Sequence, residues 1–187
     1  MVVSKTIAGL VIEVVQGDIT VQNDMEAIAN AANAKLRGGG GVDGAIHRVA
    51  GPQLKNEAVK LAPISPGQAV ITAAYNLPNR YVIHCLGPVY GRDFPPAKLL
   101  ADCYRNALQL ADRHDIESIA FPAISTGVFG YPMQEAATVS LQAVCESAPG
   151  LQHVKRVRFV LFDTHAFQIF SQELQVLGGP GKKIPEK

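Results

Sequence analysis

The sequence has almost no excess charge of either sign, since 17 lysine and arginine residues face 16 aspartate and glutamate residues. It has no basic stripe of the kind that binds duplex nucleic acid and no polybasic run that would attract a membrane surface. We therefore expect neither duplex nucleic acid nor a membrane as a partner. Any phosphate site in this chain must rely on backbone N–H groups rather than on massed cations.

Long apolar runs are also missing. No stretch of 18 apolar residues is present, so no transmembrane helix is expected, and Glu13 interrupts the apolar run near the start, so no signal peptide is expected. The three cysteines (Cys85, Cys103 and Cys145) lie far apart, inside apolar runs, without zinc-ligand spacing. This usage is typical of reduced core thiols in a reducing compartment, and it predicts a cytoplasmic protein with no cysteine nucleophile. Neither cysteine nor histidine spacing supports a catalytic metal, and no cofactor is expected.

The 187 residues, 48% of them hydrophobic, suffice for one domain with a sizeable core. We place that domain at residues 1–177. The last ten residues, GGPGKKIPEK at 178–187, are predicted to be a disordered tail.

Apolar patterning predicts strands that alternate with helices. The segment 26–33, EAIANAAN, is ambiguous between helix and strand, although two asparagines just before a glycine run suit a buried strand end better. Gly17 and Asp18 read as turn residues between two extended pieces. The remaining predicted strands are 7–15, a hairpin-like pair at 68–74 and 80–86, 117–122 and 155–162. The predicted helices are 42–61, broken at Gly51-Pro52 and with Ile46, Val49 and Ala50 on one face, then 97–114, 132–147 and 166–177.

This alternation predicts an α/β sandwich with a largely parallel sheet, in which ligands bind where loops leave the carboxyl ends of strands. Two such loops carry glycine: the run Gly38–Gly41 and the loop Ser125–Gly130. A glycine loop that enters a helix gathers free N–H groups and a positive dipole end, so two of them would clamp a pyrophosphate. Asp43 follows the first loop, and taken alone it reads either as a helix N-cap or as a functional acid.

Four segments, in this order, resemble the macrodomain family. They are GDIT at 17–20, NAAN at 30–33, GGGGVDGAIHRVAG at 38–51, which looks like the loop of the MacroD-type branch, and STGVFG at 125–130. The resemblance covers about residues 7–175. It implies a three-layer α/β/α sandwich with a mixed, largely parallel central sheet that binds ADP-ribose. In this branch it also implies hydrolysis of ADP-ribosyl esters of aspartate or glutamate on proteins, and of O-acetyl-ADP-ribose.

The resemblance also implies a binding role for each matching position. Asp18 would accept a hydrogen bond from the adenine amino group, Ile19 would pack on the adenine or offer its N–H, and Phe162 would stack on the purine. Asp18 and Phe162 each have a plainer alternative, a turn aspartate for the first and a core aromatic for the second. Backbone amides of both loops would hold the diphosphate, and Phe129 would cover the distal ribose or simply anchor its loop. The loop positions are Gly39, Gly40, Gly41 and Val42, then Ser125, Thr126, Gly127, Val128 and Phe129.

Asn33 and Asp43 would face the distal ribose, where the scissile ester hangs. The expected reaction is attack of a water, held between the ligand's phosphate and Asp43, at the ester carbonyl, while attack at the anomeric carbon stays open. A carboxylate is a weak base at neutral pH, so positioning could matter more than proton abstraction. His47, one helical turn after Asp43, reads as a structural residue, a partner of Asp43 or a proton shuttle.

Some features limit the resemblance or favour another function. Ala29 stands where the family more often has valine, and Phe162 where relatives can have tyrosine. His84 reads as a core residue, and His114, His153 and His165 as surface or loop positions. A non-catalytic reader of ADP-ribose is the main alternative function, but a reader needs no acid beside the distal ribose. A dinucleotide-dependent oxidoreductase is disfavoured because no GxGxxG opens the first strand–helix unit.

Overall fold

One mixed seven-stranded sheet runs through the protein in the order β1-β2-β7-β6-β3-β5-β4. The computed structural model describes residues 1–177. The four inner pairings are parallel, and the outer pairs β1–β2 and β4–β5 are antiparallel. The largely parallel sheet is therefore confirmed. The strands are β1 (Val2–Ile7), β2 (Leu10–Gln16), β3 (Ala27–Ala31), β4 (Ala69–Ala73), β5 (Tyr81–Cys85), β6 (Ser118–Phe121) and β7 (Arg156–Leu161).

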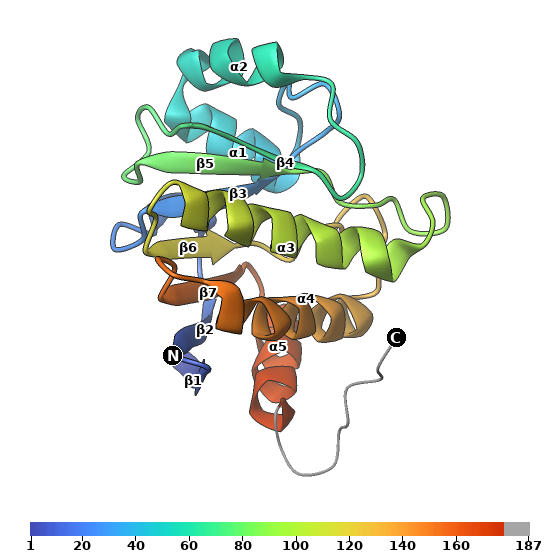
Figure 1. Cartoon of the computed structure of the whole chain (residues 1–187). Helices are drawn as coiled ribbons and strands as arrows, with labels where there is room; N and C mark the ends of the chain where they lie inside the picture. Colours follow the sequence, from blue (N-terminus) through green and yellow to red (C-terminus); the bar gives the residue numbers. More distant parts are fainter. Residues whose placement is uncertain (178–187) are drawn as a thin grey trace.

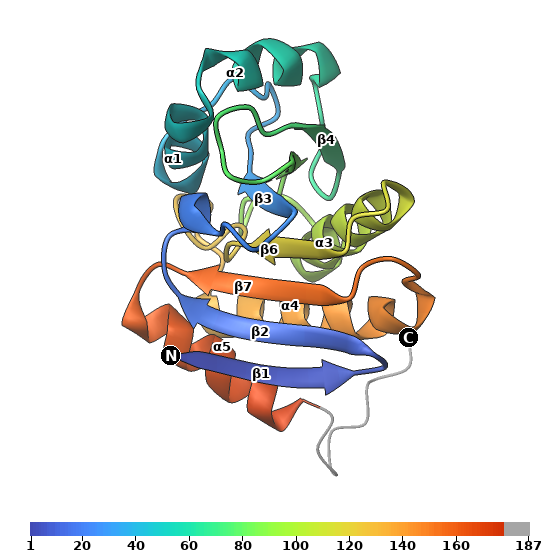
Figure 2. The ribbon, with the colours of Figure 1, turned by 90° about the vertical axis from the view of Figure 1, so that its left-hand side faces the viewer.

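Helices cover both faces of this sheet, which gives the expected three layers (Figures 1 and 2). α3 (Pro96–Arg113), α4 (Met133–Ser147) and α5 (Thr164–Val176) pack on one face. α1 (Gly41–Ala50) and α2 (Pro52–Ala58) pack on the other face, over the half of the sheet that holds β3, β5 and β4. Figure 2 shows β1, β2 and β7 with no helix in front of them. Short 3-10 helices are η1 (Ile19–Val21), η2 (Val59–Leu61) and η3 (Ala148–Gly150).

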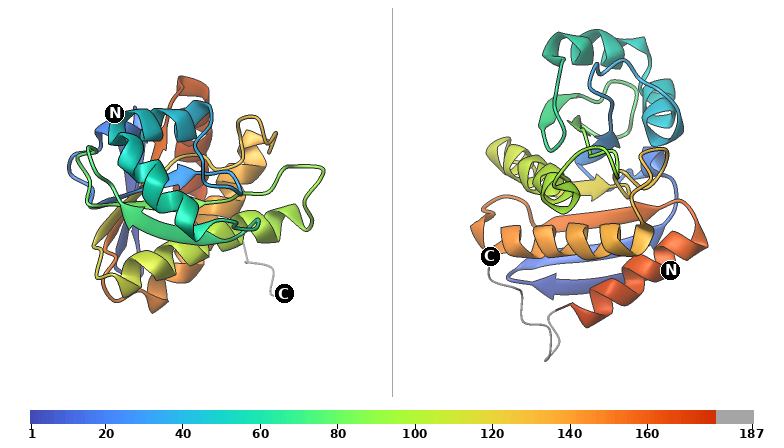
Figure 3. Two further views of the ribbon diagram at one scale, coloured as in Figure 1. Left: turned by 90° about the horizontal axis from the view of Figure 1, so that it is seen from above. Right: turned by 90° about the vertical axis from the view of Figure 1, so that its right-hand side faces the viewer.

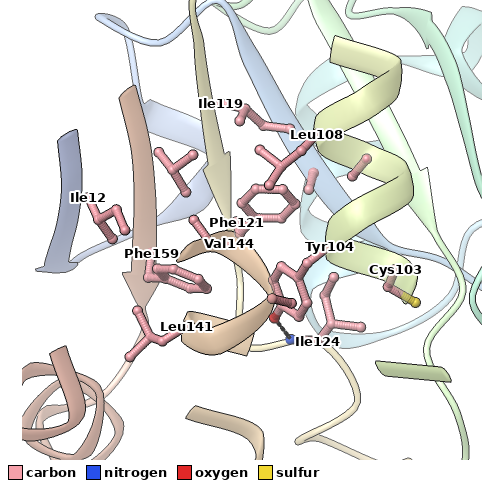
Figure 4. Packing of buried hydrophobic residues seen from close by; sticks show 14 of the residues in the cluster. Ile12, Cys103, Tyr104, Leu108, Ile119, Phe121, Ile124, Leu141, Val144 and Phe159 are labelled. Atoms are coloured by element: carbon pink, nitrogen blue, oxygen red, sulfur yellow. Dashed lines mark hydrogen bonds between the residues drawn. The ribbon is translucent and has the colours of Figure 1, made fainter. Parts of the chain in front are cut away.

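The two-residue period of the strands divides the apolar side chains between the faces. Ala27 and Ala29 face the α3–α5 layer, whereas Ile28 between them faces α1 and α2. In the larger cluster the Tyr104 ring packs 5.0 Å from the Phe121 ring, centroid to centroid (Figure 4). The Tyr104 hydroxyl donates to the Pro122 carbonyl and accepts from the Ile124 N–H, both at 3.2 Å. The core thereby fixes the start of the loop after β6.

The predicted strand 7–15 is wrong in its bounds, because a tight hairpin divides that segment. β1 ends at Ile7 and β2 begins at Leu10, and the turn residues Ala8 and Gly9 have φ values of 49° and 82°. Two consecutive positive φ angles are what a two-residue hairpin needs, and Gly9 was the available signal. Figure 3 shows the resulting β1–β2 edge beside α5.

Most other element predictions are confirmed within a few residues, and the ambiguous segment 26–33 contains strand β3. Two details are wrong. Asp18 begins the 3-10 helix η1 rather than joining two extended pieces, and Val49 is 41% exposed while Ile46 and Ala50 are buried. The tail predicted at 178–187 lies outside the described residues. Among residues 1–177, no helix has both the length and the hydropathy to cross a membrane.

Candidate functional site

The segments singled out in the sequence gather at the carboxyl edge of the sheet. Asp18 follows β2, Phe162 follows β7, the loop Ser125–Gly130 follows β6, and the run from Asn33 to Asp43 follows β3. These four strands are neighbours in the order β2-β7-β6-β3, so the segments span three inter-strand steps, or ~14 Å. An elongated ligand is needed to touch all of them.

The sheet itself opens between β6 and β3. These strands pair only through Ala27 with Ile119 and Ile28 with Ala120, so the rest of β3 is not paired with β6. The helices that follow the two strands lie on opposite faces, α1 after β3 and α4 after β6. Such a switch point is where ligands bind in open α/β sheets.

The glycine run forms the entrance to α1. Gly38 and Gly41 have φ values of 79° and 57°, which other residues rarely adopt, and Gly40 is the N-cap without a side-chain acceptor. The first N–H groups of α1 therefore have no capping side chain and are available to an anion. The N-cap interpretation of Asp43 is wrong, because a glycine takes that position and Asp43 is the third residue of the helix.

Two close approaches require glycine at this entrance. A methyl group placed on Gly44 would come within 2.4 Å of the Gly39 carbonyl oxygen, so the loop folds directly over the first turn of the helix. A methyl group on Gly39 would lie 3.3 Å from Oδ2 of Asp43. The glycine run therefore covers the Asp43 carboxylate and also leads into α1.

Asp43 is held by three side chains and is only 6% exposed. The Asn30 amide donates to its Oδ1 at 2.7 Å, and Nε2 of His47 lies 3.3 Å from the same oxygen. The Asn33 amide nitrogen lies 3.4 Å from Oδ2 and 3.0 Å from the Gly38 carbonyl, so it ties the carboxylate to the glycine run. Asn33 and Asp43, which the sequence predicted to act together, do lie together.

Of the two Asp43 oxygens, Oδ2 has fewer and longer contacts than Oδ1. An ionised carboxylate can only accept hydrogen bonds. The first turn of α1 stabilises its negative charge. Oδ2 can therefore receive a hydrogen bond from a water or a ribose hydroxyl at the loop. His47 lies beside the carboxylate, and a methyl group on Gly38 would come within 3.2 Å of its ring, a position that fits each of the three roles considered for it.

Three functional candidates were missed from the sequence: Asn30, His84 and Thr72. Nδ2 of Asn30 also lies 3.2 Å from Nδ1 of His84, whose Nε2 lies 2.9 Å from Oγ1 of Thr72. The first asparagine of the NAAN segment was a usable signal for Asn30. His84 is buried, as expected of a core residue, but it belongs to a polar chain that ends at Asp43.

The loop after β6 carries its own constraint. Ser125 is buried with φ 68°, and its backbone carbonyl accepts from the Tyr131 N–H at 2.9 Å. A methyl on Gly87 would collide with Oγ of Ser125, so the loops after β5 and β6 touch. Phe129 packs against a small apolar cluster that includes Leu36, so both glycine-bearing segments contribute to this cluster. Gly127 and Val128 are exposed, and the side chain of Thr126 caps back onto the Ala123 carbonyl.

The opposite end of the edge is open to solvent. Oδ1 of Asp18 accepts from the N–H and hydroxyl of Thr20 at 2.8 and 2.7 Å, which leaves Oδ2 without a hydrogen-bond partner within residues 1–177. The Ile19 side chain is buried in the α1 and α2 core, so its backbone N–H is the group left for a base. Phe162 is 84% exposed, the highest value of any phenylalanine in the described part.

The cysteines, the possible metal ligands and the surface hollow of the described residues do not indicate a second reactive site. Burial raises the pKa of Cys103 to about 12 and that of Cys145 to about 11, and it raises the pKa of Cys85 as well. Within the described residues, no group of three or more His, Cys, Asp or Glu side chains is placed to hold a metal. A surface hollow of about 380 Å³ lies at the amino edge of the sheet, opposite to the site, and its charged walls include Glu26, Glu117 and Arg156.

Comparison with known proteins adds a family to this geometry. Residues 29–140 match the model of the Macro domain. The chain is 48% identical to a protein of Klebsiella pneumoniae named O-acetyl-ADP-ribose deacetylase, over 87% of this chain and 95% of that protein. It superimposes on the Oceanobacillus iheyensis macrodomain solved with ADP (TM-score 0.89, 39% identity, 95% and 96% of the two chains). It also superimposes on a Trypanosoma brucei macrodomain solved with ADP-ribose (TM-score 0.79, 36% identity, 86% and 68%). The chain belongs to the Macro domain family.

Proposed function

We propose that this protein binds ADP-ribose along the carboxyl edge of its sheet and hydrolyses esters of its distal ribose. The substrates would be O-acetyl-ADP-ribose and ADP-ribosyl esters of aspartate or glutamate on proteins. The observation that carries the proposal is the Asp43 carboxylate, buried under the glycine run and aimed by Asn30 and Asn33. The name of the Klebsiella relative and the ligands of the two solved macrodomains support it.

The ligand would lie with its base at Asp18 and Phe162 and its diphosphate between the two glycine loops. Backbone N–H groups at the start of α1, and those of the Ser125–Phe129 loop, would bind the diphosphate. The distal ribose would then reach Asn33 and Asp43. Phe129, which packs against the apolar cluster that contains Leu36, would cover that sugar.

The reaction would be water attack at the ester carbonyl. Oδ2 of Asp43 would orient the water, the acyl carbon–oxygen bond would break, and the proton of the water would end on the released ribose oxygen. The products are the free carboxylic acid and a ribose hydroxyl. A positioned group of this kind contributes about 10²–10⁴-fold to a rate.

A substrate panel with isotope labelling tests the proposal. O-acetyl-ADP-ribose, a glutamate-linked peptide and a serine-linked peptide are incubated side by side in ¹⁸O-water. We expect release from the two esters only, with ¹⁸O in the carboxylic acid. Label in the ribose would instead indicate attack at the anomeric carbon. Tight binding of ADP-ribose without release from any ester would make the protein a reader, the second function that the same loops would serve.

A further inference from the structure

Behind Asn30, two buried side chains extend the polar chain away from the proposed substrate. Nδ1 of His84 lies 3.2 Å from Nδ2 of Asn30, and Nε2 of His84 lies 2.9 Å from Oγ1 of Thr72. The exposed fractions are 1% for His84 and 2% for Thr72. Asn30, His84 and Thr72 come from the neighbouring strands β3, β5 and β4, so the sheet itself sets their spacing. Neither His84 nor Thr72 has a role in the proposed reaction.

The donors and acceptors of this chain can be assigned from Asp43 outward. A carboxylate only accepts, so the group of Asn30 that faces Oδ1 of Asp43 at 2.7 Å is its NH₂. That NH₂ also faces Nδ1 of His84, which must then be the acceptor of the ring. The remaining ring hydrogen lies on Nε2 and is donated to the hydroxyl of Thr72. The hydroxyl passes its own hydrogen to the Ala73 carbonyl at 3.0 Å.

A charged ring would break this pattern, because Nδ1 would then carry a hydrogen toward the Asn30 NH₂. Burial, with a smaller contribution from the nearby His47, lowers the pKa of His84 to about 4, although Asp43 acts in the opposite direction. His47 and Asp43, both on α1, are the ionisable groups that affect the ring, and its hydrogen-bond partners from β3 and β4 do not ionise. The ring is therefore neutral at physiological pH.

We propose that His84, locked by Thr72 with Nδ1 as its acceptor, is a positioning residue that fixes the Asn30 amide and thereby aims Asp43. The inference rests on the proposed hydrolase function. Two acceptors, Asp43 and His84, both require the NH₂ of Asn30, so they hold the amide in one orientation. Oδ1 of Asn30 is buried without a hydrogen-bond partner in the described chain, so no contact there sets the orientation.

Thr72→Val and Thr72→Ser form a matched pair for this inference. Valine has the shape of threonine without the hydroxyl, so Nε2–H of His84 loses its acceptor and the ring hydrogen can move to Nδ1. Asn30 must then turn its carbonyl oxygen toward the ring, and this rotation withdraws the NH₂ from Asp43. We expect kcat for O-acetyl-ADP-ribose to fall at least about tenfold in Thr72→Val and to return with serine.

The dissociation constant of ADP-ribose separates positioning from a general structural role. It should stay within about twofold of the wild-type value in both variants, since Thr72 is buried in β4 and belongs to neither of the loops expected to hold the diphosphate. Wild-type kcat in Thr72→Val would overturn the inference. If the wild-type protein did not hydrolyse O-acetyl-ADP-ribose at all, the proposed function would be overturned instead. The two failures are therefore distinguishable.

The protonation of the two ring nitrogens of His84 can be measured without an activity assay, first in the wild-type protein. In a long-range ¹H–¹⁵N spectrum of the wild-type protein, we expect Nε2 protonated and Nδ1 bare across pH 5 to 8. In Thr72→Val the two nitrogens should exchange roles or average. A hydrogen on Nδ1 in the wild-type protein would overturn the inference even if every variant behaved as expected.

Discussion

The two ends of the carboxyl edge differ in how much of their structure exists before a ligand arrives. At the β3 end, Asp43 is buried, covered by glycine backbone and held by three side chains. At the β2 and β7 end, Phe162 is 84% exposed and Asp18 holds only its own turn. The buried end suits chemistry, which needs fixed groups, whereas the open end suits binding. Variants at the buried end should therefore alter turnover, and variants at the open end should alter affinity.

The largest effect should come from Gly44→Ala, because this change should lower affinity and turnover together instead of turnover alone. The added methyl would come within 2.4 Å of the Gly39 carbonyl oxygen, so the glycine run must move off α1. We expect both the affinity for ADP-ribose and kcat to fall by more than about 100-fold, together with a lower melting temperature. Gly150→Ala is the control, because a methyl group added there would meet no other part of the chain within 4 Å beyond its two neighbours. Unchanged affinity in Gly44→Ala would mean that the run does not bind the diphosphate.

The next effect is on stability and arises from His84. Its pKa in the folded protein is about 4, below the ordinary 6.5, so the unfolded chain binds a proton that the buried ring does not. The free energy of unfolding should therefore fall as the pH falls from about 6.5 to about 4, by roughly 3 kcal/mol at ~1.4 kcal/mol per pH unit. Urea unfolding of wild type and His84→Asn at pH 7 and pH 4 measures the difference. Equal losses in both proteins would contradict it.

How far the sequence predicted this site depends on the kind of constraint. Gly38–Gly41 were readable because positive φ angles and helix entrances demand particular residue types. Asn33 was readable because the segment NAAN resembles that of the macrodomain family. The chain Asn30–His84–Thr72 was not, because Asn30 and His84 are 54 residues apart and meet only through strand order. The β1–β2 hairpin was missed because a single glycine after Ala8 is a weak turn signal inside an apolar run.

At the open end, Asp18→Ala should weaken ADP-ribose binding by about 1–3 kcal/mol, the scale of a hydrogen bond to a charged group. Asp18→Asn separates this effect from the turn, because an asparagine oxygen can still accept from Thr20 while its NH₂ repels the adenine amino group. Calorimetry should show weaker binding in both variants, with kcat at saturating substrate retained. If Asp18→Asn binds as tightly as wild type, the base is held elsewhere.

The smallest effect should come from Phe162→Leu. Loss of the aromatic face should weaken binding of ADP-ribose by about 1 kcal/mol, and Phe162→Tyr should keep it. Stability should hardly change, since the side chain is already exposed. Equal affinities in the leucine and tyrosine variants would show that no purine stacks there.

The role of the buried carboxylate is tested by measuring Asp43→Ala twice, by calorimetry with ADP-ribose and by turnover of O-acetyl-ADP-ribose. Asp112→Ala is the control, because that carboxylate holds the backbone N–H groups of Gln152–Val154, far from the site. We expect Asp43→Ala to bind ADP-ribose within a fewfold of wild type and to lose at least about 100-fold in kcat. Full turnover in Asp43→Ala would contradict the central claim that this buried carboxylate orients the attacking water.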